Sequence, residues 1–405
     1  MKTGFTSFLL FCFLSGCIAS CQVKSGLEVL AEKGFDILRG KNVAVITNPT
    51  GVDKNYASIV DILTKADDIN LVAIFAPEHG FFGGVQGNIS DTTYPGTNVP
   101  VYSLYGSTRV IPDEKLKNVD VIVYDIQDIG SRSYTYISTM KLAMEQAAKN
   151  GKEFVVLDRP NPINGMVIDG PVLETKFRSF IGIAEIPYVH GMTSGELALY
   201  FNSELGIGCK LTVVPMKGWT RKMTWQDTGL PWIPTSPHIP EPDTPFYYPI
   251  TGVIGELSIV SVGVGYTLPF KIIGAPWIDG KKLTDELNKK NLPGVFFHTF
   301  YFKPYYGIYK DQFCKGVRII VKDPLNYKPF LTCLAIIDTL LKLHPDKFNF
   351  SNKEVRDRIS TFDKACGTDE IRKKLVSGED HLSIQNWCNP GIQDFVKKRE
   401  KYLLY

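Results

Sequence analysis

Short apolar runs alternate with amphipathic stretches through the first half of the chain. Runs at residues 42–47, 71–75, 119–124 and 154–157 are rich in β-branched residues and end at turn residues. Between them, residues 56–65 and 134–149 carry apolar positions with the spacing of a helix that buries one face. Continuously apolar strands that alternate with helices are typical of a parallel sheet covered on both faces. The first half therefore predicts a Rossmann-like α/β lobe.

The second half has a less regular pattern. It predicts helices over 193–205, 281–290 and 331–343, and strands over 211–215 and 259–264. Residues 218–249 are rich in Pro and Trp and predict a long irregular segment, which in a compact protein is often functional. The chain also exceeds the size that one hydrophobic core serves. We therefore expect two lobes, a Rossmann-like lobe over 22–180 and a second lobe over 181–405.

The N-terminus has the pattern of an export signal. Lys2 precedes an apolar run at residues 8–14, which is too short to span a bilayer and is typical of a signal peptide. Small residues then precede Cys17 and again Cys21, and each site resembles the lipobox of a bacterial lipoprotein. We expect residues 1–21 to be a lipoprotein-type signal, with Cys17 or Cys21 acylated. The alternative is an ordinary secretory signal in which neither cysteine has a role.

The same pattern indicates where the protein works. It predicts an exported lipoprotein that faces the periplasm and meets the membrane only through its lipid anchor. No later stretch approaches the ~20 apolar residues that a membrane span requires. Five widely spaced cysteines follow the signal without a Cys-x-x-Cys pair, so neither a disulfide framework nor a structural zinc site is expected. One or two bridges in an oxidising compartment are the alternative.

Composition and missing motifs exclude several classes of function. A formal net charge of +3 gives no support for nucleic-acid binding. The chain carries no Gly-x-Gly-x-x-Gly after a predicted strand, no P-loop, no Gly-x-Ser-x-Gly elbow and no His-Glu-x-x-His. We therefore expect neither a cofactor nor a metal ion.

Polar clusters follow the predicted strands of the first half. They lie at residues 48–51, 77–80, 125–128 and 158–161. In open α/β sheets, ligands bind in the crevice beyond the carboxyl ends of the strands. Four clusters at one edge of a sheet therefore predict a polar cleft there.

Glu78 is the most distinctive residue of these clusters, because it follows a buried strand and lies between Pro77 and Gly80. Glycoside hydrolysis requires a protonated carboxyl group that assists the leaving group, and a second carboxylate that activates water or attacks carbon. Glu78 suits the first role if its surroundings keep it protonated. Asp125 and Asp128 are the nearest candidates for the second. The alternative for Glu78 is a hydrogen-bonding role within its own loop.

Other charged residues near the predicted cleft permit two interpretations each. Arg132 offers a fork that binds a ligand carboxylate, or it pairs with Asp125 or Asp128. Asp158 and Arg159 bind substrate or form a buried ion pair that fixes the shape of their loop. His190 precedes a predicted helix, and either enters the cleft or is a satisfied structural residue.

A series of motifs in this order resembles a known family. The motifs include Asn-Pro-Thr-Gly (48–51), Pro-Glu-His-Gly-Phe (77–81), Tyr-Asp-Ile-Gln-Asp-Ile-Gly-Ser-Arg (124–132), Asp-Arg-Pro-Asn-Pro (158–162), His-Gly-Met-Thr (190–193), Pro-Thr-Ser-Pro (234–237) and Gly-Ala-Pro-Trp-Ile (274–278). The series resembles the exo-β-N-acetylmuramidases of the NamZ type, long catalogued as a domain of unknown function, and covers nearly the whole mature chain. The resemblance implies a Rossmann-like catalytic lobe over 22–180, a second, smaller α+β lobe over 181–405 and an active-site cleft between them. It also implies release of N-acetylmuramic acid from the non-reducing ends of peptidoglycan fragments, with Glu78 as the catalytic glutamate.

One segment departs from the family pattern. The family commonly has Glu-Gly-Thr-Asn followed by Gly-Arg-Gly-Thr, where this chain has Glu256-Leu-Ser-Ile and then Gly-Val-Gly-Tyr (263–266). Glu256 is retained, but Ile259 and Val264 replace the Asn and the Arg. This loss of polar groups keeps open a second hypothesis, a non-catalytic envelope lipoprotein that binds muropeptides or glycans.

The leading hypothesis is a peptidoglycan exo-glycosidase. Glu78 is its predicted general acid, Asp125 or Asp128 its second carboxylate, and peptidoglycan-derived sugars are its partners. Arg132 is predicted to bind the lactyl carboxylate of muramic acid. The candidates for substrate binding are His79, Arg132, Asp158, Arg159, Asn161, His190 and Glu256.

Overall fold

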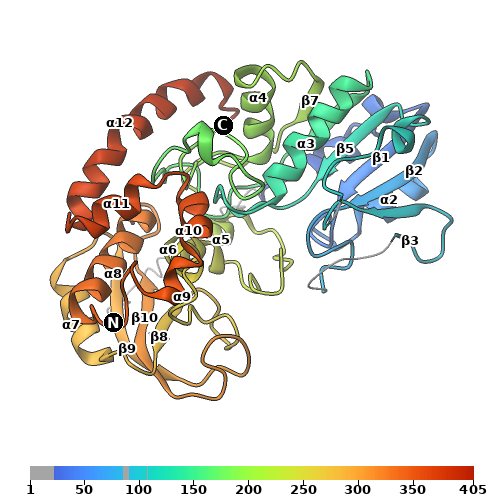
Figure 1. The fold of residues 1–405 in the computed structure, drawn as a ribbon. Helices are drawn as coiled ribbons and strands as arrows, with labels where there is room; N and C mark the ends of the chain where they lie inside the picture. The colour runs from blue at the N-terminus through green and yellow to red at the C-terminus, as the bar shows by residue number, and fades with distance from the viewer. Residues whose placement is uncertain (1–21, 85–90, 107) are drawn as a thin grey trace, which may run out of the picture.

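A computed structural model describes residues 22–84, 91–106 and 108–405, which form two lobes (Figure 1). The first lobe contains a seven-stranded sheet whose strands are parallel except for the β3–β4 pair. In the order of their pairing these strands are β3 (Thr92–Thr93), β4 (Pro100–Ser103), β2 (Ile69–Ala76), β1 (Lys41–Thr47), β5 (Val121–Asp125), β6 (Glu153–Leu157) and β7 (Lys210–Val214). The strands predicted from the apolar runs are confirmed.

Alternate residues of the central strand β1 enter two different cores. Val43 and Val45 pack with helices α1 (Gly26–Glu32) and α2 (Ile59–Lys65) on one face of the sheet. Ala44 and Ile46 pack with α3 (Tyr136–Lys149) and α4 (Ser194–Glu204) on the other face. Because side chains alternate across a strand, burial on both faces requires the continuous apolar run that the sequence shows.

The second lobe contains a three-stranded antiparallel sheet. Its strands, in order, are β8 (Ile272–Ala275), β10 (Cys314–Val321) and β9 (Val295–Phe302). Helices cover this sheet and continue beyond it: α6 (Thr244–Gly255), α7 (Gly280–Lys289), α8 (Pro329–Leu343), α9 (Lys353–Arg356), α10 (Ile359–Cys366), α11 (Glu370–Val376) and α12 (His381–Arg399). The remaining short helices are α5 (Trp225–Thr228), η1 (Asp36–Leu38), η2 (Asp113–Leu116), η3 (Thr175–Phe177) and η4 (Glu400–Tyr402). The predicted α/β fold with a smaller α+β lobe is confirmed.

The strand predicted at residues 259–264 is wrong. The segment makes one isolated bridge, between Ser261 and Gly274, and then turns. Gly263 and Gly265 have φ angles of +83° and +93°, a conformation that strands do not use. The alternating apolar residues of this segment pack into the core without forming a strand.

The predicted lobe boundary at residue 180 is also misplaced, because α4 and β7 both belong to the first lobe. Asp158, at the end of β6, accepts hydrogen bonds from the Gly195 N–H at 2.7 Å and from the Thr193 hydroxyl at 2.7 Å. Thr193 and Glu196 form the capping box that begins α4. The start of α4 is therefore fixed to the first sheet by a carboxylate.

The end of the chain returns to the first lobe. Helix α12 runs along one side of the molecule, and the C-terminus lies beside α4 (Figure 1). The hydroxyl of Tyr405 accepts a hydrogen bond from the Met216 N–H at 2.7 Å and donates one to Asp158 at 2.8 Å. The last residue thus completes the hydrogen bonding of the carboxylate that holds α4.

Two further expectations concern membrane spans and cysteines. Among the described helices, none has the length and apolarity that crossing a membrane requires. The five cysteines of residues 22–405 are buried and free, so the expected lack of a disulfide framework holds for this part of the chain.

Tyr405→Phe removes only the hydroxyl that bridges Met216 and Asp158. We expect the free energy of unfolding to fall by about 1–3 kcal/mol, because a buried N–H and a carboxylate each lose a partner. Urea denaturation measures this change. Tyr56→Phe is the matched control, since Tyr56 is 64% exposed. A Tyr405 variant as stable as the control would contradict the bridging role.

Candidate active site

A cavity of about 410 Å³ opens between the two lobes. Its first side is formed by residues that follow β2, β4 and β5. Of the four predicted polar clusters, the one at residues 77–80 lines the cavity, and those at 48–51, 125–128 and 158–161 do not. Its second side comes from the second lobe and from α10. The lining residues are Glu78, His79, Tyr105, Arg109, Ser133, Tyr134, Thr135, Tyr136, Ser179, Phe180, Ile181, Ser236, His238, Ile239, Tyr248, Glu256, Phe270 and Lys364.

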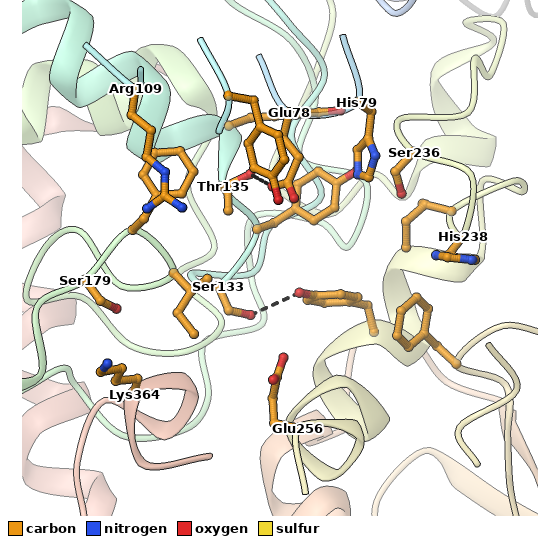
Figure 2. A pocket seen from close by; sticks show the side chains of 18 residues that line it. Glu78, His79, Arg109, Ser133, Thr135, Ser179, Ser236, His238, Glu256 and Lys364 are labelled. Carbon is orange, nitrogen blue, oxygen red and sulfur yellow. Dashed lines mark hydrogen bonds between the residues drawn. The ribbon is translucent and has the colours of Figure 1, made fainter. Parts of the chain in front are cut away.

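Glu78 enters this cavity from the loop after β2 (Figure 2). The Thr135 hydroxyl donates a hydrogen bond to Glu78 Oε2 at 2.5 Å. A hydrogen bond to Glu78 also raises the pKa of the Tyr105 phenol. Thr135 is the N-cap of α3, so the positive end of that helix lies beside the carboxylate. These hydrogen bonds fix the position of the Glu78 side chain in the cavity.

Glu256 enters from the other side, at the C-cap of α6 (Figure 2). Burial raises the pKa of this carboxyl group, and the positive charge of Arg358 opposes the shift only in part. The negative end of a helix dipole disfavours a second negative charge at the same place. Of the two glutamates that line the cavity, Glu256 is therefore the one whose burial favours the protonated form.

Asp125 and Asp128 do not line the cavity, so the structure does not support either one as the second carboxylate. Asp125 is fully buried and accepts two hydrogen bonds from Arg159, at 2.5 Å from Nε and 2.9 Å from Nη2. Asp128 is buried and accepts the Gly130 N–H at 2.7 Å. Burial raises the pKa of Asp128 to about 7. The chain after β5 turns into the lobe interior before it returns to the cavity at Ser133.

Arg132 has no access to a ligand, and the predicted contact with a lactyl carboxylate is wrong. Its side chain is fully buried, and it does not pair with Asp125 or Asp128 either. It donates four hydrogen bonds to backbone carbonyl oxygens, those of Pro171 (2.7 Å), Ile186 (2.7 Å), Ala365 (3.0 Å) and Cys366 (2.7 Å). The guanidinium thus joins the segment around residues 171–186 to the last turn of α10.

Four other predicted ligand contacts are buried structural residues outside the lining. Asp158 holds the start of α4, and Arg159 pairs with Asp125, so the two do not form an ion pair with each other. The Asn161 amide donates to the Met192 carbonyl at 3.0 Å. His190 Nδ1 accepts the Met192 N–H at 3.2 Å, and burial lowers the His190 pKa to about 3. These residues lie at or near the carboxyl edge of the sheet, as predicted, but their side chains point into the protein and not into the cavity.

Of the predicted site residues, Glu78, His79 and Glu256 line the described cavity. The sequence interpretation did not select Tyr105, Thr135, His238, Arg109 or Lys364, which also line it. Ser236 lies in one of the family motifs and could have been selected on that ground. Arg109 and Lys364 carry no local signal, because they approach the cavity from a loop and from a helix far apart in the chain.

Known proteins match this chain over nearly its whole length. Residues 43–243 match the family model described as exo-β-N-acetylmuramidase NamZ, N-terminal, and residues 246–405 match the C-terminal model of the same family. The peptidoglycan β-N-acetylmuramidase NamZ of Bacillus subtilis strain 168 is 44% identical over 386 residues, which are 95% of this chain and 92% of that protein.

Two solved structures have the same fold. A DUF1343 family protein from Bacteroides fragilis superposes with a TM-score of 0.90 at 45% identity, and covers 95% of this chain and 99% of its own. A second DUF1343 family protein from that organism has a TM-score of 0.73 at 30% identity, with the same shares covered.

Fold and cavity define a two-lobed α/β protein with two carboxyl groups facing one ligand-sized space. The chain belongs to the NamZ family of exo-β-N-acetylmuramidases, as both family models and the Bacillus relative establish. The resemblance inferred from the motifs is confirmed. The junction between the two family models, after residue 243, agrees with a first lobe that includes β7.

Arg132→Lys tests the structural role of this buried guanidinium. A single ammonium does not reach four carbonyl oxygens, so we expect the free energy of unfolding to fall by at least about 2 kcal/mol. Chemical denaturation measures the loss. Arg109→Lys is the control, because Arg109 is exposed in the structure. Unchanged stability of the Arg132 variant would show that the four hydrogen bonds contribute little.

Proposed function

We propose that this chain is a glycosidase that releases N-acetylmuramic acid from the non-reducing ends of peptidoglycan fragments. The observation that carries the proposal is the pair Glu78 and Glu256, which face one cavity from opposite lobes in a chain of the NamZ family. A cavity of about 410 Å³ is in the size range of small-ligand pockets. The name of the Bacillus relative supports the sugar and the polymer.

The surroundings of the two glutamates favour Glu256 as the general acid, whereas the sequence predicted that role for Glu78 and only substrate binding for Glu256. Glu256 is the carboxyl group whose pKa is raised by burial, so it is the better proton donor near neutral pH. Glu78 is positioned by the hydrogen bond from Thr135 and lines the same cavity as Glu256, which suits the role of the second carboxyl group. We assign Glu256 as the general acid and Glu78 as the second catalytic carboxyl group.

In this assignment, Glu256 gives its proton to the glycosidic oxygen while the bond from that oxygen to the anomeric carbon breaks. The leaving sugar departs as an alcohol. Glu78 stabilises the positive charge that develops on the ring, and then either attacks the anomeric carbon or directs a water molecule to it. The mechanism requires neither a metal ion nor a cofactor at any step.

The two roles predict different responses to the leaving group. Glu256→Gln should lose about 100-fold or more in kcat/KM on a muramic acid–glucosamine disaccharide, because that leaving group needs a proton. On an aryl β-N-acetylmuramide with an acidic phenol as leaving group, the same variant should lose little. Glu78→Gln should lose about 100-fold or more on both substrates. If Glu78→Gln were the variant that keeps its activity on the aryl glycoside, Glu78 would be the general acid and Glu256 the second carboxyl group.

Dependence on pH provides a second readout of the same variants. Because burial raises the pKa of Glu256, this group stays protonated to higher pH than an exposed glutamate. Activity on the disaccharide should fall as pH rises through that pKa, and Glu256→Gln should lack this basic limb. Binding of the disaccharide by wild-type protein without turnover of either substrate would instead support a glycan-binding protein.

We propose separately that the protein is an exported envelope lipoprotein. Cys17 and Cys21 lie outside the described residues, so the support comes from the apolar run and the small residues before each cysteine. Expression with an alkyne-tagged fatty acid should label the wild-type protein in the membrane fraction. Cys17→Ser and Cys21→Ser, made one at a time, identify the acylated cysteine. Labelling that survives in both single variants and in the double variant would contradict the proposal.

A further inference from the structure

The cavity has a positively charged end in addition to its carboxyl pair. Arg109 and Lys364 both line it, and Figure 2 shows them on the same side, with Ser179 between them. His79 and His238 lie on the opposite side, beyond the two glutamates. Neither Arg109 nor Lys364 forms a salt bridge with a carboxylate of the described residues. Two cations that face a ligand cavity without an anionic partner indicate a site for an anion.

Arg109 is held in place by stacking. Its guanidinium carbon lies 4.2 Å from the centre of the Phe180 ring, a cation–π contact that restrains the group. Phe180 is itself fixed, because its carbonyl oxygen accepts a hydrogen bond from Ser138 on α3 at 2.7 Å. A guanidinium that stacks by its face keeps its N–H edges available for the two oxygens of a carboxylate.

Arg132 fixes the backbone next to Lys364. Lys364 lies in α10 directly before Ala365 and Cys366, whose carbonyl oxygens accept hydrogen bonds from Arg132 at 3.0 and 2.7 Å. The buried guanidinium therefore fixes the helical turn that carries the second cation. Between the two cations, the Ser179 hydroxyl is buried and has no hydrogen-bond partner among the described residues. A free hydroxyl beside two cations adds a neutral donor for the same anion.

We propose that Arg109, Lys364 and Ser179 form a carboxylate subsite that binds the lactyl group of the terminal muramic acid. This inference rests on the proposed function and names the part of the substrate that the positively charged end of the cavity recognises. N-acetylglucosamine lacks the lactyl ether and offers no anion to this end. An amide-linked peptide on the lactyl group removes the negative charge, so the subsite favours sugars whose carboxylate is free.

Three aryl glycosides that share one leaving group test the subsite: the β-N-acetylmuramide, its lactyl methylamide and the β-N-acetylglucosaminide. Wild-type protein should prefer the free acid over the methylamide. Arg109→Ala and Lys364→Ala should each lower kcat/KM on the free acid by roughly 10- to 100-fold. On the methylamide and the glucosaminide they should change it little. Lys364→Arg should keep most of the preference, because it keeps the charge.

Lys117→Ala is the matched control, since Lys117 is an exposed cation outside the cavity lining and should leave all three rates unchanged. Equal losses on the acid and the methylamide in the Arg109 and Lys364 variants would overturn the subsite while leaving the glycosidase proposal intact. A wild-type protein that hydrolyses none of the three glycosides would instead refute the proposed function. Circular dichroism of each variant separates a loss of folding from a loss of recognition.

Discussion

The guanidinium of Arg132 joins the segments that form the wall of the cavity. Burial lowers its pKa to about 10, which leaves it charged at neutral pH, and four backbone carbonyl oxygens satisfy that charge. These carbonyl groups belong to two distant parts of the chain, one near residues 171–186 and the other at the end of α10, so one side chain connects both. Without this cation, buried carbonyl groups from both would lose their partners at considerable cost. The shape of the cavity therefore depends on a residue that never contacts its contents.

The two glutamates of the cavity lie beside opposite ends of two helices. Glu78 lies by the N-terminus of α3, and Glu256 lies at the C-terminus of α6. Burial raises the pKa of Glu256, and the negative end of the α6 dipole also favours its protonated form, which is what a general acid requires. The cavity also has a positively charged end, where Arg109 and Lys364 lie on the same side. Chemistry and recognition are thus provided by different sides of one small space.

A second buried network connects the start of α4 and the C-terminal residue to the sheet. Asp158 accepts hydrogen bonds from Thr193, Gly195 and Tyr405, so one carboxylate fixes the start of α4 and the last residue together. Burial raises the pKa of Asp158 to about 6 in spite of these donors. The polar residues after β6 therefore stabilise the fold, although they follow a strand in the same way as ligand-binding residues do.

The sequence by itself determined the local elements and the place of Glu78. Apolar runs of β-branched residues predicted the parallel strands, since burial on both faces leaves a continuous pattern, and Glu78 follows one of them directly. The tertiary structure alone decided which of the neighbouring polar residues face the ligand. A charged side chain after a strand has the same sequence pattern whether it turns outward, as Glu78 does, or inward to a partner, as Asp125 does toward Arg159. Partners such as Glu256 and Lys364 come from residues distant in the chain, and only the packing of the second lobe against the first brings them to Glu78.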